Sequence, residues 1–241
     1  MKSLQVVTPH MECLFNCPFC IAKAHNHENN FIDYYHANRE LWKENFINVL
    51  KNNPDLGYVV ITGTNEPMQS PECVLDIINL TRKYRPDIKI EIQTRWYMEN
   101  ELYNKLDVVC YSISNYLFLD KIKPMGKISR YVLILTDSFN NKTLKDILDI
   151  IPKEVTQLTF KVLQNSITND TPIDEWINKH RIDPETFKNL EKDINAYQGN
   201  LSIRLDKDCM VADNRYKVFR EDCNTYNDWD ELPKEKVIVK K

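Results

Sequence analysis

Three cysteines near the start of the chain, Cys13, Cys17 and Cys20, constrain its fold and its chemistry more than any other feature. Their spacings of four and three positions allow one loop to turn all three thiols toward a single inorganic centre. Iron–sulfur clusters are normally held by four cysteine thiolates, but the next cysteine along the chain is Cys73. A cluster held by three thiolates keeps one iron without a protein ligand, and an open coordination position is typical of a catalytic metal site.

The spacing C-x3-C-x2-C resembles the signature of the radical S-adenosylmethionine (SAM) enzymes. In that family a [4Fe–4S] cluster holds SAM on its open iron through the amino and carboxylate groups of the methionine moiety. The resemblance implies reductive cleavage of SAM to a 5′-deoxyadenosyl radical, which abstracts hydrogen from a substrate or adds to it. Phe19 also matches, because the family often has an aromatic residue at this position beside the adenine.

A zinc site is the main alternative for these cysteines. With His25, or with His27 as a second candidate, the three thiolates could close a tetrahedron around one zinc ion. Such a protein would be redox-inert and would act by binding, with nucleic acid as one conceivable partner. Cysteine makes up 7 of the 241 residues, so this spacing arises by chance in roughly 0.6 per cent of such chains. The spacing therefore favours a metal centre over unliganded cysteines, and the motifs further along favour the cluster.

Composition narrows the class of protein. A chain of 241 residues with 42% hydrophobic content fits one large domain or two small ones and can bury a substantial core. It has no apolar run of about 18 residues that would span a membrane, and its first residues lack the apolar segment of a signal peptide. Seven cysteines without a disulfide framework indicate the reducing cytoplasm. The net charge of −3 argues against a general basic surface for nucleic acid.

Short apolar segments alternate with helical ones over the first two thirds of the chain. The expected strands are 4–9, 58–62, 88–94, 108–114, 131–136 and 158–163, and the expected helices are 33–51 (capped by Asp33), 71–83, 99–105, 116–122 and 144–151. This alternation is typical of right-handed βαβ units around a parallel sheet. It fits the partial (β/α)6 TIM-like barrel that the resemblance implies, and a doubly wound flavodoxin-like sheet is the structural alternative.

The pattern changes after the sixth strand. We expect residues 1–165 to form the barrel core and residues 166–241 to form a C-terminal extension of the same globular unit. The extension has two expected helices, then two expected strands that could pair as a β-hairpin with a turn near Asp213 and Asn214: 173–180, 184–197, 201–205 and 216–219. We expect this extension to close the open side of the barrel and to shape the substrate pocket.

A second motif follows the expected strand at 58–62 and consists of Gly63, Thr64, Asn65, Glu66 and Pro67. Radical SAM enzymes typically have Gly-Gly-Glu-Pro here, where the backbone and the glutamate bind the amino group of SAM. Glu66 and Pro67 match, and Gly63 fits a longer form with an extra leading glycine, whereas Thr64 and Asn65 replace the usual glycines. The resemblance therefore assigns Glu66 and the backbone of 63–65 to SAM, because an ammonium group bound at a metal requires a nearby anion.

Polar residues also follow the later strands. Thr94 and Arg95 lie where the family often has Thr-Asn-Gly, so Thr94 could hydrogen-bond SAM and Arg95 could pair with its carboxylate. Ser112 and Ser114 share one face at the end of the fourth strand, where the family commonly places a serine on the ribose or carboxylate of SAM. Lys161 is flanked by apolar residues in the sixth strand and is a candidate contact for a carboxylate.

The remaining cysteines and histidines predict no second metal centre. Cys209 and Cys223 are too few for an auxiliary cluster, so we expect one cluster only. Cys73 and Cys110 are expected in the core, the commonest place for free cysteine. His10, like His25, flanks the cysteine loop, where a solvated histidine is commoner than a substrate contact.

The sequence thus predicts a radical SAM enzyme that modifies a small-molecule or nucleotide substrate by hydrogen abstraction, with no indication of the reaction subtype. A peptide-modifying radical SAM enzyme is the second possibility, and a member that binds the cluster without catalysis is the third. The zinc-stabilised binding protein is the alternative from another class. The enzyme would require an external electron donor such as flavodoxin or ferredoxin, and it would have no membrane partner.

Overall fold

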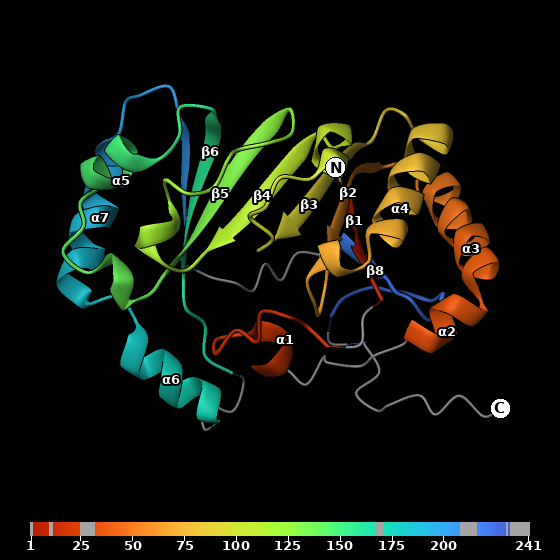
Figure 1. Cartoon of the computed structure of the whole chain (residues 1–241), viewed down its shortest axis with the longest axis horizontal. Coiled ribbons are helices and arrows are strands. Elements are labelled where there is room, and N and C mark those ends of the chain that lie inside the picture. Colours follow the sequence, from red (N-terminus) through yellow and green to blue (C-terminus); the bar gives the residue numbers. More distant parts are fainter. Residues whose placement is uncertain are drawn as a thin grey trace.

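The computed structural model describes residues 2–9, 12–24, 32–166, 171–207, 216–229 and 231. In this part of the chain one nine-stranded sheet has the order β7-β6-β5-β4-β3-β2-β1-β8-β9 (Figure 1). Every neighbouring pair is parallel except β8 and β9. The strands are β1 (Lys2–Val7), β2 (Leu56–Thr62), β3 (Lys89–Thr94), β4 (Val108–Ile113), β5 (Ile128–Leu135), β6 (Val155–Val162), β7 (Ser202–Asp206), β8 (Tyr216–Phe219) and β9 (Thr225–Tyr226).

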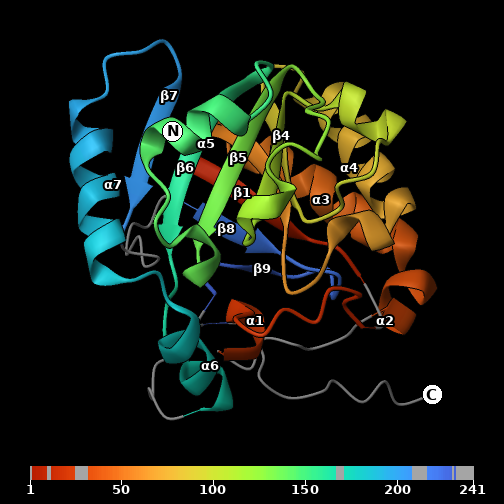
Figure 2. The same ribbon diagram turned by 60° about the vertical axis from the view of Figure 1, so that its left-hand side comes forward.

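The helices divide into those beside the sheet and those at the ends of its strands. Figures 1 and 2 show α3 and α4 along one half of the sheet, α5 and α7 along the other, and α1 and α6 next to each other beyond the strand ends. We call this side, where β1 to β7 end, the carboxyl edge, and the opposite side the amino edge. The helices are α1 (Ile21–Ala24), α2 (Ile32–Ala37), α3 (Arg39–Asn52), α4 (Pro71–Tyr84), α5 (Leu144–Ile150), α6 (Pro172–His180) and α7 (Pro184–Ala196).

Four short 3-10 turns lie in the connections between strands. Three of them follow β2, β4 and β5, and one precedes β4. They are η1 (Pro67–Gln69), η2 (Glu101–Lys105), η3 (Tyr116–Phe118) and η4 (Asp137–Phe139). Each begins after a residue whose side chain accepts a hydrogen bond from the main chain two positions later, which satisfies a free N–H group of the turn. No helix in the described ranges has both the length and the apolar character that crossing a membrane requires.

The core lies between the sheet and the helices that flank it. A strand presents alternate side chains to opposite faces, and Leu4 and Val6 of β1 are fully buried on the helical side. Trp42 and Phe46 of α3 lie against Phe219 of β8, with ring centroids 5.3 and 5.6 Å from the Phe219 ring. Strand β8 is thereby joined to the first part of the chain, although it comes near the end of the sequence.

Polar side chains on several strands form a hydrogen-bonded row. Thr62 Oγ1 donates to the Gln93 side chain at 3.1 Å, and Gln93 donates to Glu91 at 3.3 Å. Arg130 then bridges Glu91 at 2.8 Å and Gln157 at 2.7 Å. The row links β2, β3, β5 and β6. These residues alternate along their strands with the core residues, so they belong to the face of the sheet opposite the helices.

The strand order decides between the two expected folds. Strands β1 to β6 are neighbours in chain order, so the chain winds across the sheet in one direction. A doubly wound sheet would reverse its strand order next to the first strand. The flavodoxin-like alternative is therefore excluded, and the expected mostly parallel, open sheet of a partial (β/α)6 barrel is confirmed.

The hairpin expected between segments 201–205 and 216–219 is wrong. Strand β7 instead pairs with β6, and β8 pairs with β1, at widely separated positions in the sheet. Each of these strands extends the parallel sheet, and the hairpin of the extension is formed by β8 and β9. The turn expected near Asp213 and Asn214 lies outside the described residues.

The single helix expected over 33–51 is also wrong, because the chain breaks it into α2 and α3 at Asn38. Asn38 has φ −123°, which is not helical, and its side chain donates to the Tyr34 carbonyl at 2.9 Å. Asp33 lies in the first turn of α2, not at a cap position before the helix. A side chain that competes for main-chain partners is a common reason for an asparagine to interrupt a helix.

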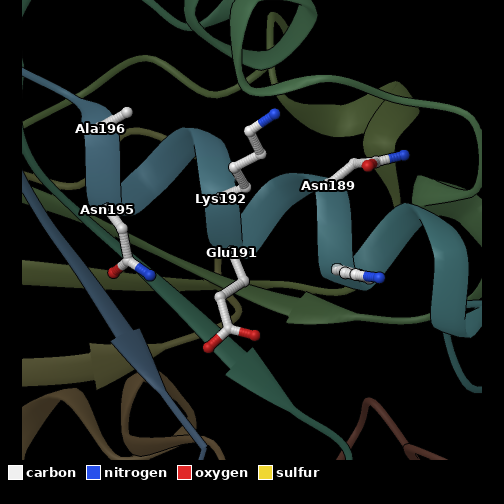
Figure 3. Close-up of a pocket in the computed structure, with 6 residues that line it drawn as sticks. Asn189, Glu191, Lys192, Asn195 and Ala196 are labelled. Carbon is white, nitrogen blue, oxygen red and sulfur yellow. The ribbon is translucent and has the colours of Figure 1, made fainter.

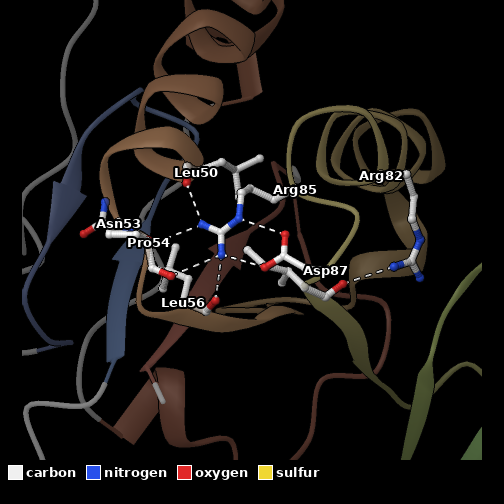
Figure 4. A network of polar contacts seen from close by, with 8 residues as sticks. Leu50, Asn53, Pro54, Leu56, Arg82, Arg85 and Asp87 are labelled. Carbon is white, nitrogen blue, oxygen red and sulfur yellow. Dashed lines mark hydrogen bonds and ion pairs between the residues drawn. The ribbon is translucent and has the colours of Figure 1, made fainter.

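Arg85 fastens the amino edge (Figure 4). This residue follows α4, and its guanidinium donates to both oxygens of Asp87 at 2.9 and 2.8 Å. It also donates to four carbonyl groups at 3.1–3.3 Å, those of Leu50, Asn53, Pro54 and Leu56. The end of α3, the start of β2 and the end of α4 are therefore held by one side chain.

Candidate functional site

The cysteine loop follows β1 at the carboxyl edge, where residues of the connection from β2 to α4 hold it. Gln69 Oε1 accepts a hydrogen bond from the main-chain N–H of Leu14 at 3.0 Å, and Gln69 Nε2 donates to the carbonyl of Glu12 at 2.7 Å. Ser70 Oγ donates to the carbonyl of Pro9. Sequence analysis missed Gln69 and Ser70, and their position directly after the Glu66 motif was the signal that could have indicated them.

Cys13, Cys17 and Cys20 are half-buried. The main-chain N–H of Cys20 donates to the Cys17 carbonyl at 3.2 Å, and α1 begins at the next residue. Burial raises the pKa of Cys17, Arg95 opposes that rise, and the neighbouring thiols of Cys20 and Cys13 add to it. Among the described residues no three Cys, His, Asp or Glu side chains form a group that could hold one metal ion. His25 and His27 of the zinc alternative lie outside the described residues.

Glu66 follows β2 and is only 3% exposed. Its Oε1 accepts hydrogen bonds from Thr94 Oγ1 at 2.5 Å and from the Met68 N–H at 3.1 Å, and its Oε2 accepts one from the Arg95 N–H at 2.7 Å. Burial raises the pKa of Glu66, and these hydrogen bonds oppose the rise. A carboxylate has about four lone-pair positions, so one position remains for a further donor.

Arg95 lies between Glu66 and the cysteine loop. Its main chain donates to Glu66, while its Nη1 donates to Cys17 Sγ and its Nη2 to Ser114 Oγ, both at 3.0 Å. The guanidinium carbon is 5.4 Å from the ring centroid of Phe19. Its Nε is buried and has no hydrogen-bond partner among the described residues. The guanidinium therefore retains a buried donor, Nε, in the middle of the site.

The segment that replaces the glycines of the family motif is tied to the end of β1. Gly63 has φ +145°, and a Cβ atom there would lie 2.8 Å from Val7 Cγ1, so only glycine fits without a shift. Asn65 Nδ2 donates to the Thr8 carbonyl at 3.1 Å, and Asn65 Oδ1 accepts from Thr8 Oγ1 at 3.4 Å. Thr64 is buried as well. This segment and the cysteine loop are thus built from adjoining strand ends.

The two serines at the end of β4 differ in their contacts. Ser114 Oγ accepts from Arg95, and the Ser114 carbonyl accepts from Thr136 Oγ1 at 2.7 Å. Ser112 contacts the site through its carbonyl, which accepts from the Tyr97 hydroxyl at 2.5 Å. The structure therefore brings the Ser114 side chain to Arg95, whereas Ser112 contacts Tyr97 through its main chain.

Helix α6 lies against the cysteine loop through aromatic residues. The ring centroids of Phe19 and Trp176 are 5.5 Å apart, and Trp176 stacks on His180 at 4.4 Å. His180 Nδ1 lies 2.8 Å from Asp137 Oδ2, in the turn after β5. Sequence analysis missed Trp176, because nothing in its local sequence indicates a partner more than 150 positions away.

The other candidates from the sequence lie apart from this constellation. Lys161 is half-buried in β6. The expected core positions of Cys73 and Cys110 are confirmed, and Cys223 is buried as well, with its carbonyl accepting from Asn45 Nδ2 at 3.1 Å. His10 and Cys209 lie outside the described residues.

An open hollow on the surface of α7 has no connection with the cysteine loop (Figure 3). Its lining comes from one helix and consists of five polar residues and one alanine: Lys188, Asn189, Glu191, Lys192, Asn195 and Ala196. Glu191 already accepts a hydrogen bond from Lys207. We therefore place the candidate site at the carboxyl edge and not in this hollow.

Comparison with known proteins resolves the fold family. No protein-family model matches the sequence, and no curated protein sequence matches it significantly. Solved structures do match: native anSMEcpe with bound AdoMet has a TM-score of 0.55 and 13% identity, over 83% of this chain and 63% of that one. The chain has the fold of the radical SAM enzymes.

Two further solved structures support the same assignment of fold. The complex of anSMEcpe with AdoMet and the Cp18Cys peptide has a TM-score of 0.56 and 13% identity, with coverage of 83% and 63% of the two chains. Streptococcus suis SuiB bound to S-adenosylmethionine has a TM-score of 0.54 and 11% identity, over 94% of this chain and 60% of that one. This chain therefore spans about 60 per cent of the length of the solved radical SAM chains that it matches.

The residues at the carboxyl edge fit both groups that this fold family implies. The three half-buried thiols do not converge on one metal ion, but they are the ligand type that an iron–sulfur cluster takes, and a guanidinium donates to one of them. The amino-acid end of SAM carries an ammonium and a carboxylate. Glu66 retains an acceptor position for the first, and the buried Nε of Arg95 is a donor for the second.

Proposed function

We propose that this chain is a radical SAM enzyme in which Cys13, Cys17 and Cys20 hold one [4Fe–4S] cluster and Glu66 binds the amino group of SAM. The observation that carries the proposal is the placement of Arg95. Its main chain donates to Glu66 and its side chain donates to Cys17, so one residue joins the buried acid to the cysteine loop. A buried carboxylate next to a three-thiolate loop is what binding of an ammonium group at an open iron requires.

The roles of the surrounding residues follow from their contacts. Glu66 would orient the ammonium group, with Thr94 holding Oε1 of that carboxylate. The backbone of 63–65 would lie along the methionine moiety, and Phe19 beside the adenine. Ser112 and Ser114 would serve the ribose or the carboxylate, Ser114 by way of Arg95. When bound, the reduced cluster supplies one electron to SAM, whose C–S bond breaks to give methionine and the 5′-deoxyadenosyl radical.

A small polar molecule or a nucleotide is the proposed substrate, from which the radical abstracts a hydrogen atom. The hydrogen-bonded row from Thr62 to Gln157 supports a polar substrate, because it gives the sheet face opposite the helices both donors and acceptors. We assign residues 166–241 to the wall of the substrate pocket, and the contact of Trp176 with Phe19 supports this role. The enzyme would work in the reducing cytoplasm with an external donor such as flavodoxin or ferredoxin.

A peptide substrate is the second candidate. It is favoured by the fold match to anSMEcpe, which has been solved with AdoMet and the Cp18Cys peptide. This chain spans 63% of that protein, so the match supports the catalytic core more strongly than peptide recognition. Substrate-dependent formation of 5′-deoxyadenosine from peptide and from nucleotide pools would separate the two candidates.

The proposal is tested on anaerobically purified, reconstituted protein. We expect about four irons and four sulfides per chain, and 5′-deoxyadenosine after addition of reductant and SAM. Cys17→Ala should lose both, because two thiolates cannot replace three. Cys73→Ala is the matched control: it removes a buried thiol outside the loop and should keep both. One tightly bound zinc, without iron uptake or SAM cleavage, would sink the proposal in favour of the zinc-binding alternative.

A further inference from the structure

The contact between Arg95 and Cys17 places a positive charge next to a sulfur ligand of the proposed cluster. Arg95 Nη1 is 3.0 Å from Cys17 Sγ, and Ser114 holds the other Nη atom at the same distance. Phe19 and Phe15 lie against the guanidinium, with centroids 5.4 and 6.0 Å from its carbon. The side chain is therefore held from three sides in a position that points at a ligand sulfur.

The guanidinium of Arg95 forms no ion pair within the described residues. Among the described residues no carboxylate oxygen lies within ion-pair distance of it, and Glu66 accepts from the Arg95 main chain instead. By contrast, Arg85 and Arg204 each form an ion pair, with Asp87 and Asp206 respectively. An unpaired, half-buried cation has a long electrostatic reach, because solvent screens it less than an exposed one.

We propose that Arg95 sets the reduction potential of the cluster, by donating a hydrogen bond to the Cys17 sulfur and by placing its charge beside it. This inference rests on the proposed function, because it requires the cluster on the three cysteines. Reduction adds one electron to the cluster and makes it more negative. A positive charge and a hydrogen bond to a ligand sulfur stabilise that reduced form, and both are known levers on the potential of iron–sulfur centres.

Arg95 thereby has a role distinct from pairing with the carboxylate of SAM. Carboxylate pairing acts on the affinity for SAM and requires SAM to be present. Potential tuning acts on the cluster alone and is measurable before SAM is added. Ser114 is a positioning residue in this account, since it fixes the guanidinium through Nη2 and does not touch a thiol itself.

The test is a redox titration of the reconstituted protein without SAM, followed by electron paramagnetic resonance, with iron and sulfide counted in every sample. At one fixed potential, Arg95→Met should lower the ratio of reduced to oxidised cluster about tenfold, a shift of about 59 mV to more negative potential for a one-electron couple. Ser114→Ala should shift the ratio in the same direction by a smaller factor. Arg204→Met removes an arginine from the distant strand β7 and should leave the ratio unchanged.

Each outcome decides the inference. Wild-type and Arg95→Met ratios that agree within twofold would overturn it, and so would a change confined to SAM affinity. If Arg95→Met holds fewer than about four irons, Arg95→Lys takes its place; the lysine keeps the charge but not the planar donor geometry, and a ratio equal to the wild type would overturn the hydrogen-bond contribution. Failure of the wild type to assemble a cluster would instead overturn the proposed function, and the iron count distinguishes the two failures.

Discussion

Two arginines, Arg85 at the amino edge and Arg95 at the carboxyl edge, occupy similar positions beside β3 and have opposite kinds of surroundings. Arg85 directs five N–H groups at four main-chain carbonyls and both oxygens of Asp87. Arg95 donates to one thiol and one hydroxyl, and its buried Nε has no partner within the described ranges. All donor groups of Arg85 therefore have partners within the protein, whereas Arg95 retains a buried donor that a ligand could use.

The difference separates a structural edge from a functional one. At the amino edge every donor of Arg85 stabilises the junction of α3, β2 and α4. At the carboxyl edge the buried Glu66 has three neutral donors and no cation hydrogen-bonded to it. Unsatisfied buried polar groups cost free energy, and they persist at sites where a ligand supplies the missing partner. The free acceptor position of Glu66 and the unpartnered Nε of Arg95 support the proposed binding of SAM at the carboxyl edge.

The largest effect should come from Glu66→Gln. The substitution keeps the size and most hydrogen bonds of the side chain but removes the charge that would face the ammonium group of SAM. Loss of one partner of a buried charge pair costs about 2–4 kcal/mol, so SAM should bind roughly 30- to 1,000-fold more weakly. Calorimetry on reconstituted protein measures this. Glu91→Gln is the matched control, a buried glutamate paired with Arg130, and an equal loss in both variants would contradict the assignment of Glu66.

The two arginine substitutions should both lower stability, but by different amounts. Arg85→Met leaves four carbonyls without their donor and should lower the free energy of unfolding by about 2–4 kcal/mol. Arg95→Met removes two hydrogen bonds and should lower it by about 1 kcal/mol or less. Urea unfolding of the cluster-free protein measures both. A larger loss of stability in Arg95→Met than in Arg85→Met would contradict the structural role of Arg85.

Two glycines offer a matched pair at the two edges. Gly63 and Gly126 both have positive φ angles, and a Cβ would lie 2.8 Å from Val7 Cγ1 in one case and 2.7 Å from Val109 Cγ2 in the other. Each Gly→Ala substitution should therefore cost about 1–3 kcal/mol of stability. Only Gly63→Ala, within the motif that contains Glu66, should also weaken SAM binding. Thermal unfolding and SAM titration of both variants sharpen the comparison, and weakened SAM binding in Gly126→Ala would count against it.

The smallest effect is a pH dependence of the cluster-free protein. Burial raises the folded-state pKa of Glu66 above its ordinary value of 4.5, so the folded state binds this proton more tightly than the unfolded chain does. The resulting stabilisation is fully present below pH 4.5 and is lost as the pH rises through the folded pKa. Relative to Glu66→Gln, the wild type should lose stability as the pH rises above 4.5 and through the raised folded-state pKa of Glu66. Parallel melting curves that do not diverge over this range would contradict the raised pKa.

The sequence predicted the arrangement of the barrel because that arrangement is local. Apolar segments of four to eight residues, each followed by a helix, require a parallel sheet with its strand ends at one edge, and so Cys17, Glu66 and Thr94 had to meet there. Strand pairings that depend on long-range contacts could not be predicted from the sequence. Strands β7 and β8 follow each other in the chain, but β7 pairs with β6 and β8 pairs with β1. The local sequence does not indicate these pairings.

The same limit applies to the site. The motif around Glu66 indicated an acid for SAM, but not its burial or its hydrogen bonds to residues of the next strand. Arg95 was expected to face a carboxylate, whereas its contact with Cys17 depends on a separation of 78 positions in the chain. Gln69 and Trp176 also contact the cysteine loop from positions far along the chain, and their residue types alone do not indicate these contacts.

The proposed binding of SAM at an open iron of the carboxyl edge can be tested by spectroscopy of the cluster itself. The reconstituted protein is reduced, and its electron paramagnetic resonance spectrum is recorded with and without SAM, alongside Glu66→Gln. The account predicts a [4Fe–4S] signal in both proteins, whose line shape changes on addition of SAM in the wild type and changes far less in Glu66→Gln. A wild-type signal that SAM leaves unaltered, or no iron–sulfur signal at all, would contradict it.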